Sequence, residues 1–483
     1  MSTATANRTA AGSPASAGKE ATMSWAGVFF VAVAAFVGAL AQSLLVPVLP
    51  ALPAALHTSA STAAWVITVT VLVGAVAVPV LGRLGDLHGT RRLLLVCLAA
   101  MVTGSVVAAL APNIGWLITG RAIQGVAAGS LPLGISLVAV SVTKDRQASA
   151  VGLISGMLGV GGALGLPLAG IVSQVASYHV LFWIAGAAAA LAFAGVLLGV
   201  PVASPKASGT LDVTGAGLLA AALLAGLTGL SQAGSWGWGS PWTWGLLLAA
   251  ACLAVGFVQV ERRCAQPLID LTTLARRPVL LADVASVLVG FSMFGSILGT
   301  SSYVQAPRGA GYGFGASVAA AGLAMLPAGL AMLVAAPLAG RLIGLFGART
   351  ALAVGGVVLA GGWVLRLVAV ASLADVVVGT AIVGLGVGLC FAALPAIINQ
   401  HTPAAQNASA NAVNALARSL GIALVSALCG TILASVTAPV GGHLLPTLTA
   451  YRVVFIICGL GALATVVLAV LTSGRTTGSN HHG

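Results

Sequence analysis

Fourteen apolar runs follow one another along this chain of 483 residues, and each is about as long as a membrane-spanning helix. A helix needs roughly 20 apolar residues to cross the hydrocarbon core of a bilayer. Only 6% of the residues are charged, whereas soluble proteins carry about 25%. The sequence therefore predicts an all-α polytopic membrane protein surrounded by the lipid bilayer. The predicted spans are 24–50, 61–82, 91–111, 113–141, 148–174, 179–200, 212–232, 241–261, 279–303, 316–339, 350–371, 375–400, 405–436 and 448–472.

The basic residues predict how the chain is oriented in the membrane. With the N-terminus inside, fifteen of the twenty Lys and Arg fall in inside segments, two fall outside and three lie within spans. Cytoplasmic loops of membrane proteins carry such an excess of Lys and Arg. Few Lys with much Ala and Gly are typical of bacteria with GC-rich genomes. We therefore predict a multi-pass protein of the bacterial plasma membrane, with both termini cytoplasmic and no nucleic-acid partner.

A charged, glycine-rich stretch between two spans occurs twice, which indicates a duplicated helix bundle. The two copies are Pro79-x-x-Gly82-Arg83-Leu84-x-x-Leu87-x-Gly89-x-Arg91 and Pro337-x-x-Gly340-Arg341-Leu342-x-x-Leu345-x-Gly347-x-Arg349. The first half then has six spans and contains the first copy, and the second half has six spans and contains the second copy. The remaining two spans are inserted between the halves. The predicted units are a disordered cytoplasmic tail at 1–23, an N-terminal six-helix bundle at 24–200, an inserted helix pair with a charged linker at 201–278, a C-terminal six-helix bundle at 279–472 and a cytoplasmic tail at 473–483.

The first copy resembles motif A of the major facilitator superfamily, and the six, two and six spans resemble its fourteen-helix drug/proton antiporter branch. The residues that carry the resemblance are Gly82, Leu84, Asp86, Gly89, Arg91 and Arg92. The resemblance implies a major-facilitator fold, with this loop latching the two halves on the inner side in the outward-open state. The second copy has Gly344 where the first has Asp86, so the acid occurs once.

The fourth span carries Leu117-x-x-x-Arg121-x-x-Gln124-Gly125-x-x-x-Gly129, which resembles the family's motif B. The resemblance implies that Arg121 takes part in proton coupling. Arg121 lies about 12 Å from the outer end of its span, where a charge should face the bundle interior or a wet cavity. The alternative is an arginine that snorkels or bonds backbone carbonyls.

The fifth span resembles the antiporter motif of the exporters at Gly161, Gly165, Pro167 and Gly170, but has Leu166 between glycine and proline. Plain helix packing by small residues is the alternative. The first span has Ala41 where the family motif usually has an acid, and it carries Gln42 beside it. Cation recognition through this first helix is therefore in doubt.

Asp283 is the acid that lies most clearly inside a span, about 7 Å from its inner end. We take it as the leading candidate proton carrier, with Asp86 next. The alternative for Asp283 is an acid placed at a helix start, where the helix dipole favours negative charge.

The thirteenth span carries Asn411, Asn414 and Arg418 at helical spacing. This pattern predicts a polar stripe that faces a cavity, with helix–helix hydrogen bonding as the alternative. Arg366, near an outer span end, is interpreted as the partner of Asp375. The predicted lining of the substrate cavity is Gln42, Arg121, Gln124, Asn411, Asn414 and Arg418.

These features favour a proton-coupled exporter of small hydrophobic drugs, antibiotics or secondary metabolites that works by alternating access. Two arginines and no acid at mid-depth predict a preference for neutral or anionic compounds. A facilitated uniporter or importer, and a lipid translocase, remain alternatives. We expect the protein to be a monomer. We do not expect an enzyme, because the water-facing segments show no nucleophile–base pair, phosphate loop or metal-ligand spacing. No cofactor and no metal site are expected.

Overall fold

The computed structural model describes residues 23–45, 48–49, 52–202, 207, 209–369, 372–440 and 443–472. Apart from Met23, the two predicted tails lie outside these residues. Within the described part, thirteen helical segments are long and apolar enough to cross a membrane. This agrees with the prediction of a helical multi-pass membrane protein.

The N-terminal half consists of α1 to α8, and the C-terminal half consists of α12 to α16. Two further helices, α9 (Val213–Trp236) and α10 (Pro241–Glu261), lie between them in the sequence. The first half contains α1 (Trp25–Ser43), α2 (Leu52–Ala55), α3 (Ala60–His88), α4 (Thr90–Ala109), α5 (Ile114–Gly125), α6 (Ser130–Ser141), α7 (Lys144–Val175) and α8 (His179–Gly199). The linker helix α11 (Leu271–Leu274) leads to α12 (Arg277–Gln305), α13 (Val318–Val368), α14 (Leu373–His401), α15 (Asn407–Ser435) and α16 (Leu448–Leu471).

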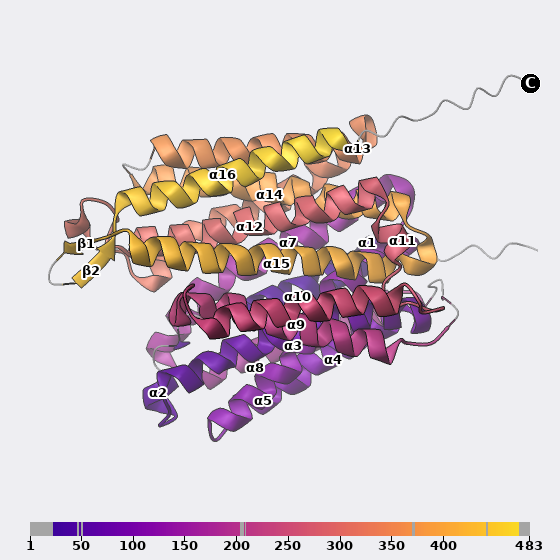
Figure 1. Cartoon of the computed structure of the whole chain (residues 1–483), viewed down its shortest axis with the longest axis horizontal. Coiled ribbons are helices and arrows are strands. Elements are labelled where there is room, and N and C mark those ends of the chain that lie inside the picture. Colours follow the sequence, from indigo (N-terminus) through magenta and orange to yellow (C-terminus); the bar gives the residue numbers. More distant parts are fainter. Residues whose placement is uncertain are drawn as a thin grey trace, which may run out of the picture.

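The long helices run side by side along one direction, with the indigo and purple N-terminal half next to the orange and yellow C-terminal half (Figure 1). A 3-10 turn, Val126–Gly129, joins α5 to α6, so the two form one span. A short antiparallel hairpin of β1 (Thr437–Val440) and β2 (His443–Pro446) projects between α15 and α16. The sequence did not predict these strands.

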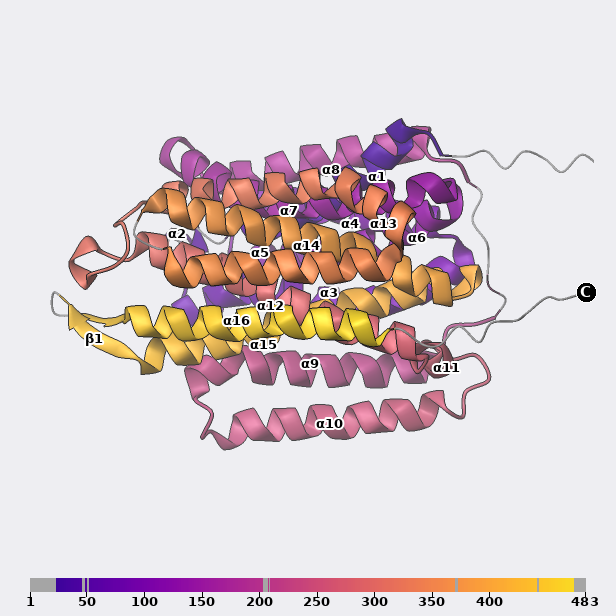
Figure 2. The ribbon, with the colours of Figure 1, turned by 90° about the horizontal axis from the view of Figure 1, so that it is seen from above.

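The inserted helix pair covers one face of the molecule. Helix α9 packs against α3 of the first half and α15 of the second, while α10 packs mainly on α9. Figure 2 shows α10 as the outermost helix on this face. Helix α9 therefore lies over the seam between α3 and α15, where the two halves meet.

The repeat seen in the sequence is also a repeat in the backbone. Gly89, between α3 and α4, has φ 97°, and Gly347, inside α13, has φ 83°. Both values lie in the region that glycine adopts without steric cost. Gly347 divides the 51-residue α13 into two arms. If each arm crosses the membrane once, the total equals the fourteen predicted spans.

The helices extend further than the apolar runs predicted. Residues 82–88, predicted as a loop, are the last two turns of α3, and residues 340–346 continue the first arm of α13. Helix propensity and packing at the aqueous boundary keep these turns helical after the apolar signal has ended. We call residues 82–92 the latch segment, and the end of the molecule that carries it the latch end.

Glycines allow the two halves to approach closely along both seams. On the α3–α15 seam, a Cβ atom at Gly82 would lie 2.6 Å from the Cβ of Ala412. On the opposite α7–α13 seam, a Cβ atom at Gly152 would lie 2.8 Å from the Cα of Ala336. Side chains at these positions would push the helices apart, so the glycines determine how tightly the halves fit together.

Candidate functional site

The carboxylate of Asp86 joins the two halves at the latch end. Its Oδ1 accepts a hydrogen bond from the Ala408 N–H and its Oδ2 accepts one from the Ser409 N–H, each at 2.9 Å. These N–H groups belong to the first turn of α15, where four donors lack partners inside the helix. The positive end of the helix dipole favours a negative charge there. Asp86 therefore acts as an acidic cap on a helix of the other half.

The remaining residues of the latch segment have separate roles. Gly82 lies against α15, and Gly89 provides the sharp turn between α3 and α4. Arg91 donates from Nη2 to the Leu197 carbonyl of α8, at 2.6 Å, and Arg92 is exposed. The sequence predicted that Asp86 would lie in a cluster with arginines, but the hydrogen bonds of its carboxylate come from the backbone of α15. Backbone donors of α15 hold Asp86, because the helix start offers two aligned N–H groups at once.

A second contact between the halves lies beside the first. Ser136 of α6 donates from Oγ to the Asn407 carbonyl at 2.9 Å, and it accepts from Asn411 Nδ2 at 3.1 Å. The same amide group donates to Asn399 Oδ1 at 2.8 Å. Asn411 is therefore buried in the closed latch end, where it contacts α6 and α14.

Asp283 lies in the second turn of α12 and faces α15. It is 7% exposed. Its Oδ1 accepts from Asn414 Nδ2 at 3.0 Å, and Asn414 also donates to Ser286 Oγ at 2.5 Å. Within the described part of the chain, Oδ2 of Asp283 has no hydrogen-bond partner. The structure thus brings together two predicted residues, the candidate carrier and one member of the polar stripe.

Arg121 lies inside the N-terminal half and is 1% exposed. Its Nε donates to the Val66 carbonyl at 3.2 Å, and its Nη1 donates to the Ala41 carbonyl at 3.0 Å and to Gln124 Oε1 at 2.9 Å. Gln124 in turn donates to Ser105 Oγ at 2.8 Å. The guanidinium thus joins α1, α3 and α5, as the carbonyl-bonding alternative predicted.

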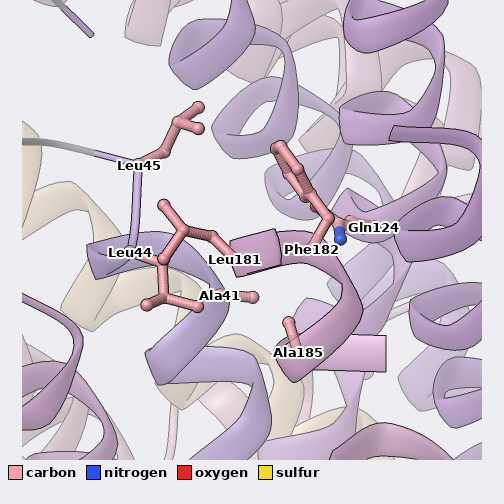
Figure 3. A pocket seen from close by; sticks show the side chains of 7 residues that line it. All are labelled: Ala41, Leu44, Leu45, Gln124, Leu181, Phe182 and Ala185. Carbon is pink, nitrogen blue, oxygen red and sulfur yellow. The ribbon is translucent and has the colours of Figure 1, made fainter. Parts of the chain in front are cut away.

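A small pocket borders this network (Figure 3). Its volume is about 10 Å³, and its walls include Ala41, Gln124 and Phe182. Such a volume holds about one water molecule. Gln42, on the next position of α1, is exposed and is not part of the wall.

Two comparisons place this architecture among known proteins. The family model described as Major Facilitator Superfamily matches residues 31–426 and again residues 284–481. The chain belongs to the major facilitator superfamily. It is 34% identical to a lincomycin resistance protein of Streptomyces lincolnensis, over 70% of this chain and 69% of that one. It is 28% identical to a tetracenomycin C resistance and export protein of Streptomyces glaucescens, over 85% and 76%.

A solved major facilitator structure, a human organic anion transporter, has a similar fold. The TM-score is 0.63 at 17% sequence identity, over 92% of this chain and 99% of that one. This likeness concerns the fold. The family and its relatives are transporters, so this protein is a multi-pass membrane transporter of the superfamily.

The residues predicted to form an antiporter motif lie where α7 packs between α1 of its own half and α13 of the other half. A Cβ atom at Gly161 would overlap the Phe36 carbonyl of α1, and one at Gly165 would overlap Ser43 of α1. On the other side, Pro167 and Gly170 contact α13. These residues pack α7 between α1 and α13, which places the motif at the α7–α13 seam.

Arg418 lies on α15 with its guanidinium carbon 5.1 Å from the centre of the Phe391 ring on α14. It is partly exposed. The residues of the predicted stripe contact several helices: Asn411 contacts α6 and α14, Asn414 contacts α12, and Arg418 contacts α12 and α14. That all three residues line one substrate cavity stays a prediction.

The interpretation of Arg366 as the partner of Asp375 is wrong. The guanidinium carbon of Arg366 lies 4.4 Å from the centre of the Phe455 ring, and Nη1 donates to Ser296 Oγ at 3.1 Å. Asp375 instead forms a capping box with Ser372 at the start of α14. Aromatic faces attract a desolvated guanidinium, and this attraction replaces the ion pair.

The hydrogen bonds of the polar groups at the linker were not predicted from the sequence. Glu261 is 3% exposed, and its carboxylate accepts from the Leu268 and Ile269 N–H groups at 3.0–3.2 Å. Asp270 accepts from Thr272 N–H at 2.9 Å and from Gln406 Nε2 at 3.2 Å. Burial works to raise the pKa of Asp270, but its hydrogen bonds with Thr272 and Thr273 hold this pKa below its ordinary value. Only the charge of the linker was visible in the sequence.

Proposed function

We propose that this chain is a proton-coupled exporter of small hydrophobic drugs, antibiotics or secondary metabolites, and that it works by alternating access. The names of its relatives support export: one is a lincomycin resistance protein and another a tetracenomycin C resistance and export protein. The observation that supports proton coupling is Asp283, an acid inside a span. One of its carboxylate oxygens is paired with Asn414, and the other has no partner in the part of the chain that the structure describes.

Helix α15 supplies a connection between proton and latch. Asn414 and Ala408 are six residues apart on this helix, which corresponds to about 9 Å. Protonation of Asp283 removes the charge that strengthens its hydrogen bond from Asn414. Helix α15 then becomes less firmly held against α12, and its first turn, which binds Asp86, can move. A proton on Asp283 would thereby favour opening of the latch end.

The orientation predicted from the basic residues places the latch end in the cytoplasm. A closed latch end then corresponds to a transporter that faces outward or is occluded. Opening of the α3–α15 and α6–α15 contacts would expose the predicted substrate cavity to the cytoplasm and let a substrate enter. Each transport cycle would close these contacts again before the substrate leaves on the outside.

The charges within the spans favour neutral or anionic substrates. Arg121 and Arg418 lie within spans, and Asp283 is close to the latch end, about 9 Å along α12 from Arg277. A permanent dication would meet two positive charges and no acid at mid-depth. Saturable export of a bis-quaternary antiseptic would contradict this preference.

The test uses proteoliposomes with an imposed pH gradient and a pH-sensitive dye inside. Candidate substrates are added to the wild type, to Asp283→Asn, and to Asp375→Asn as a matched control at a helix start. We expect substrate-driven proton flux in the wild type and the control, and its loss in Asp283→Asn. Proton flux that persists in Asp283→Asn would rule out Asp283 as the carrier.

The same assay separates the alternatives. Substrate movement without proton flux in any variant would favour a facilitated uniporter or importer. Movement of a fluorescent lipid between the leaflets, with no movement of soluble compounds, would favour a lipid translocase. Either result would exclude proton-driven export of small molecules.

A further inference from the structure

A second small cavity lies at the latch end, next to Asp283. It is lined by the linker helix α11, the first turns of α12, the junction between α14 and α15 and the first turns of α15, and its volume is about 20 Å³. Its polar lining consists of Asp270, Thr273, Asp283, Thr402, Gln406 and Ser409. This cavity is separate from the pocket beside the Arg121 network, with which it shares no lining residue.

Two buried oxygen atoms at this cavity lack partners among the described residues. They are Oδ2 of Asp283 and Oγ1 of Thr402, in residues that are 7% and 8% exposed. Buried polar groups in native proteins are nearly always hydrogen-bonded, to protein or to ordered water. A polar cavity of this size has room for about one water molecule. Two unpaired oxygens at one such cavity point to a bound water that joins them.

The wall toward the aqueous side is a hydrogen-bonded network. Gln406 Nε2 donates to Asp270 Oδ2 at 3.2 Å, and Thr273 Oγ1 donates to Gln406 Oε1 at 3.3 Å. Nearby, Arg276 donates to the His401 carbonyl at 2.8 Å. Asp270 is partly exposed, so this network forms a thin barrier between solvent and cavity.

The cavity also touches the latch. Ser409 lines it, and the N–H of Ser409 donates to Asp86. The charged side chains that line the cavity are Asp283 and Asp270. Asp86 is bonded to the lining residue Ser409, and Arg276 bonds His401, the neighbour in sequence of the lining residue Thr402. On α15, Asn414 binds the candidate carrier and Ser409, five residues earlier, binds Asp86 of the latch segment. Gln406, which belongs to the network at the aqueous boundary, directly precedes this helix.

We propose that this cavity holds the water through which Asp283 exchanges its proton with the aqueous phase at the latch end. The proposal rests on the proposed function, in which Asp283 is the carrier. On unloading, the O–H bond of the Asp283 carboxyl breaks and a new O–H bond forms on the water. The resulting hydronium passes a proton on to solvent beside Asp270, and loading reverses these steps. Thr402 is a positioning residue that holds the water by its hydroxyl.

The test compares proton-coupled transport with substrate-for-substrate exchange at equal pH. Thr402→Val removes the hydroxyl at nearly constant size, and Ala410→Leu fills the cavity without removing a polar group. Thr465→Val is the matched control, a buried threonine of α16 that bonds within its own helix. We expect both cavity variants to slow coupled transport about tenfold, the effect of a lost hydrogen bond to a charged group. Exchange and the control should be unchanged, and Thr402→Ser should restore coupling.

An infrared measurement adds a readout that a loss of folding would not imitate. The band of the protonated Asp283 carboxyl is identified by its absence in Asp283→Asn. In Thr402→Val this band should shift, because the bound water is lost. An unshifted band with wild-type coupling in both cavity variants would overturn the water site, while loss of coupling in Asp283→Asn would still support the carrier. Coupling that survives in Asp283→Asn would overturn the carrier and the water site together.

Discussion

Asp86 connects parts of the chain that are far apart: its two backbone partners on α15 lie 322 and 323 residues further along the sequence. The contact combines a negative charge, two aligned N–H donors and a helix dipole. The two donors would lose their partner if α3 and α15 separated at the latch end. Asp86 therefore contributes to holding the latch end closed, beside the contacts of Ser136 with α15.

We predict that Asp86→Asn favours opening of the latch end. The amide offers one acceptor oxygen, so one N–H of α15 faces an NH₂ group instead of a carboxylate. A hydrogen bond to a charged group contributes about 1.5–3 kcal/mol, which corresponds to an increase of roughly tenfold or more in the open population. Distances between spin labels at Arg92→Cys and Arg341→Cys, with Cys252 and Cys264 changed to serine, would measure it.

The matched control is Asp145→Asn, an exposed acid at the same end that forms an ion pair with Arg146 of its own half. This variant should give the wild-type distance distribution. An unchanged distribution in Asp86→Asn as well would show that α3 does not latch α15 through this residue.

The sequence identified the important residues, but it did not predict which groups they would contact. Asp86, Arg121 and Asp283 were recognised because they are charged residues in an apolar sequence. A charge in such surroundings is costly and usually has a bonding partner or a function. Nothing in the spacing indicated that Asp86 would cap α15 or that Arg121 would bind the Ala41 carbonyl. These partners depend on how distant helices pack, and the motif pattern contains no information on that packing.

Helix α7 shows how packing is specified at the scale of an element. It lies between α1 and α13, and its glycines face different neighbours along its length. Gly161 lies against the Phe36 carbonyl, whereas Gly162 has no atom of another element within 4 Å of a built Cβ. Adjacent positions of one helix therefore have opposite tolerance for a methyl group.

We predict that Gly161→Ala destabilises the protein and that Gly162→Ala does not. The methyl group at 161 meets backbone that cannot rotate away, so α1 and α7 must separate, at a cost of about 1–3 kcal/mol. At position 162 the methyl group has open space, and alanine is the better helix former. Thermal unfolding in detergent should give a lower melting temperature for the first variant alone. Equal melting temperatures would mean that α1 and α7 do not pack this closely.

The apolar runs predicted the helices well because membrane length imposes a minimum run. They underestimated α3 and the first arm of α13, since polar turns beyond the bilayer carry no apolar signal. They also missed β1 and β2, which contain Pro439 and Pro446 and pair only with each other. The linker helix α11 has only four residues, too short for any periodicity to indicate.

The two halves of the whole molecule repeat each other down to individual contacts. Gly82 of α3 meets Ala412 of α15, and Gly340 of α13 meets Ser149 of α7. In both cases a glycine of the repeated stretch faces the early part of a helix in the other half. The sequence repeat predicted this pseudo-symmetry, but it could not show which helices would meet.

The two copies of the repeat differ at the position that Asp86 occupies in the first copy. Four residues after Gly82 stands Asp86, which caps α15, while four residues after Gly340 stands Gly344, which has nothing within 4 Å of a built Cβ. By the repeat, the helix start that faces position 344 is that of α7, near Asp145. The molecule thus has an acidic latch on one seam and open space at the equivalent place on the other.

We predict that Gly344→Asp adds a second latch and slows transport. A carboxylate at the start of α7 would interact with the positive end of the helix dipole, and a surface charge near a helix N-terminus contributes about 0.3–1 kcal/mol. The closed state at the latch end should then gain roughly two- to fivefold in population. Substrate efflux should slow by a similar factor, and the spin-label distances should shift toward the closed state. Gly344→Ala adds a methyl group without a charge and should transport as the wild type does. If the alanine variant slowed transport equally, crowding rather than a helix cap would be the cause, and the asymmetry between the two seams would not depend on the acid.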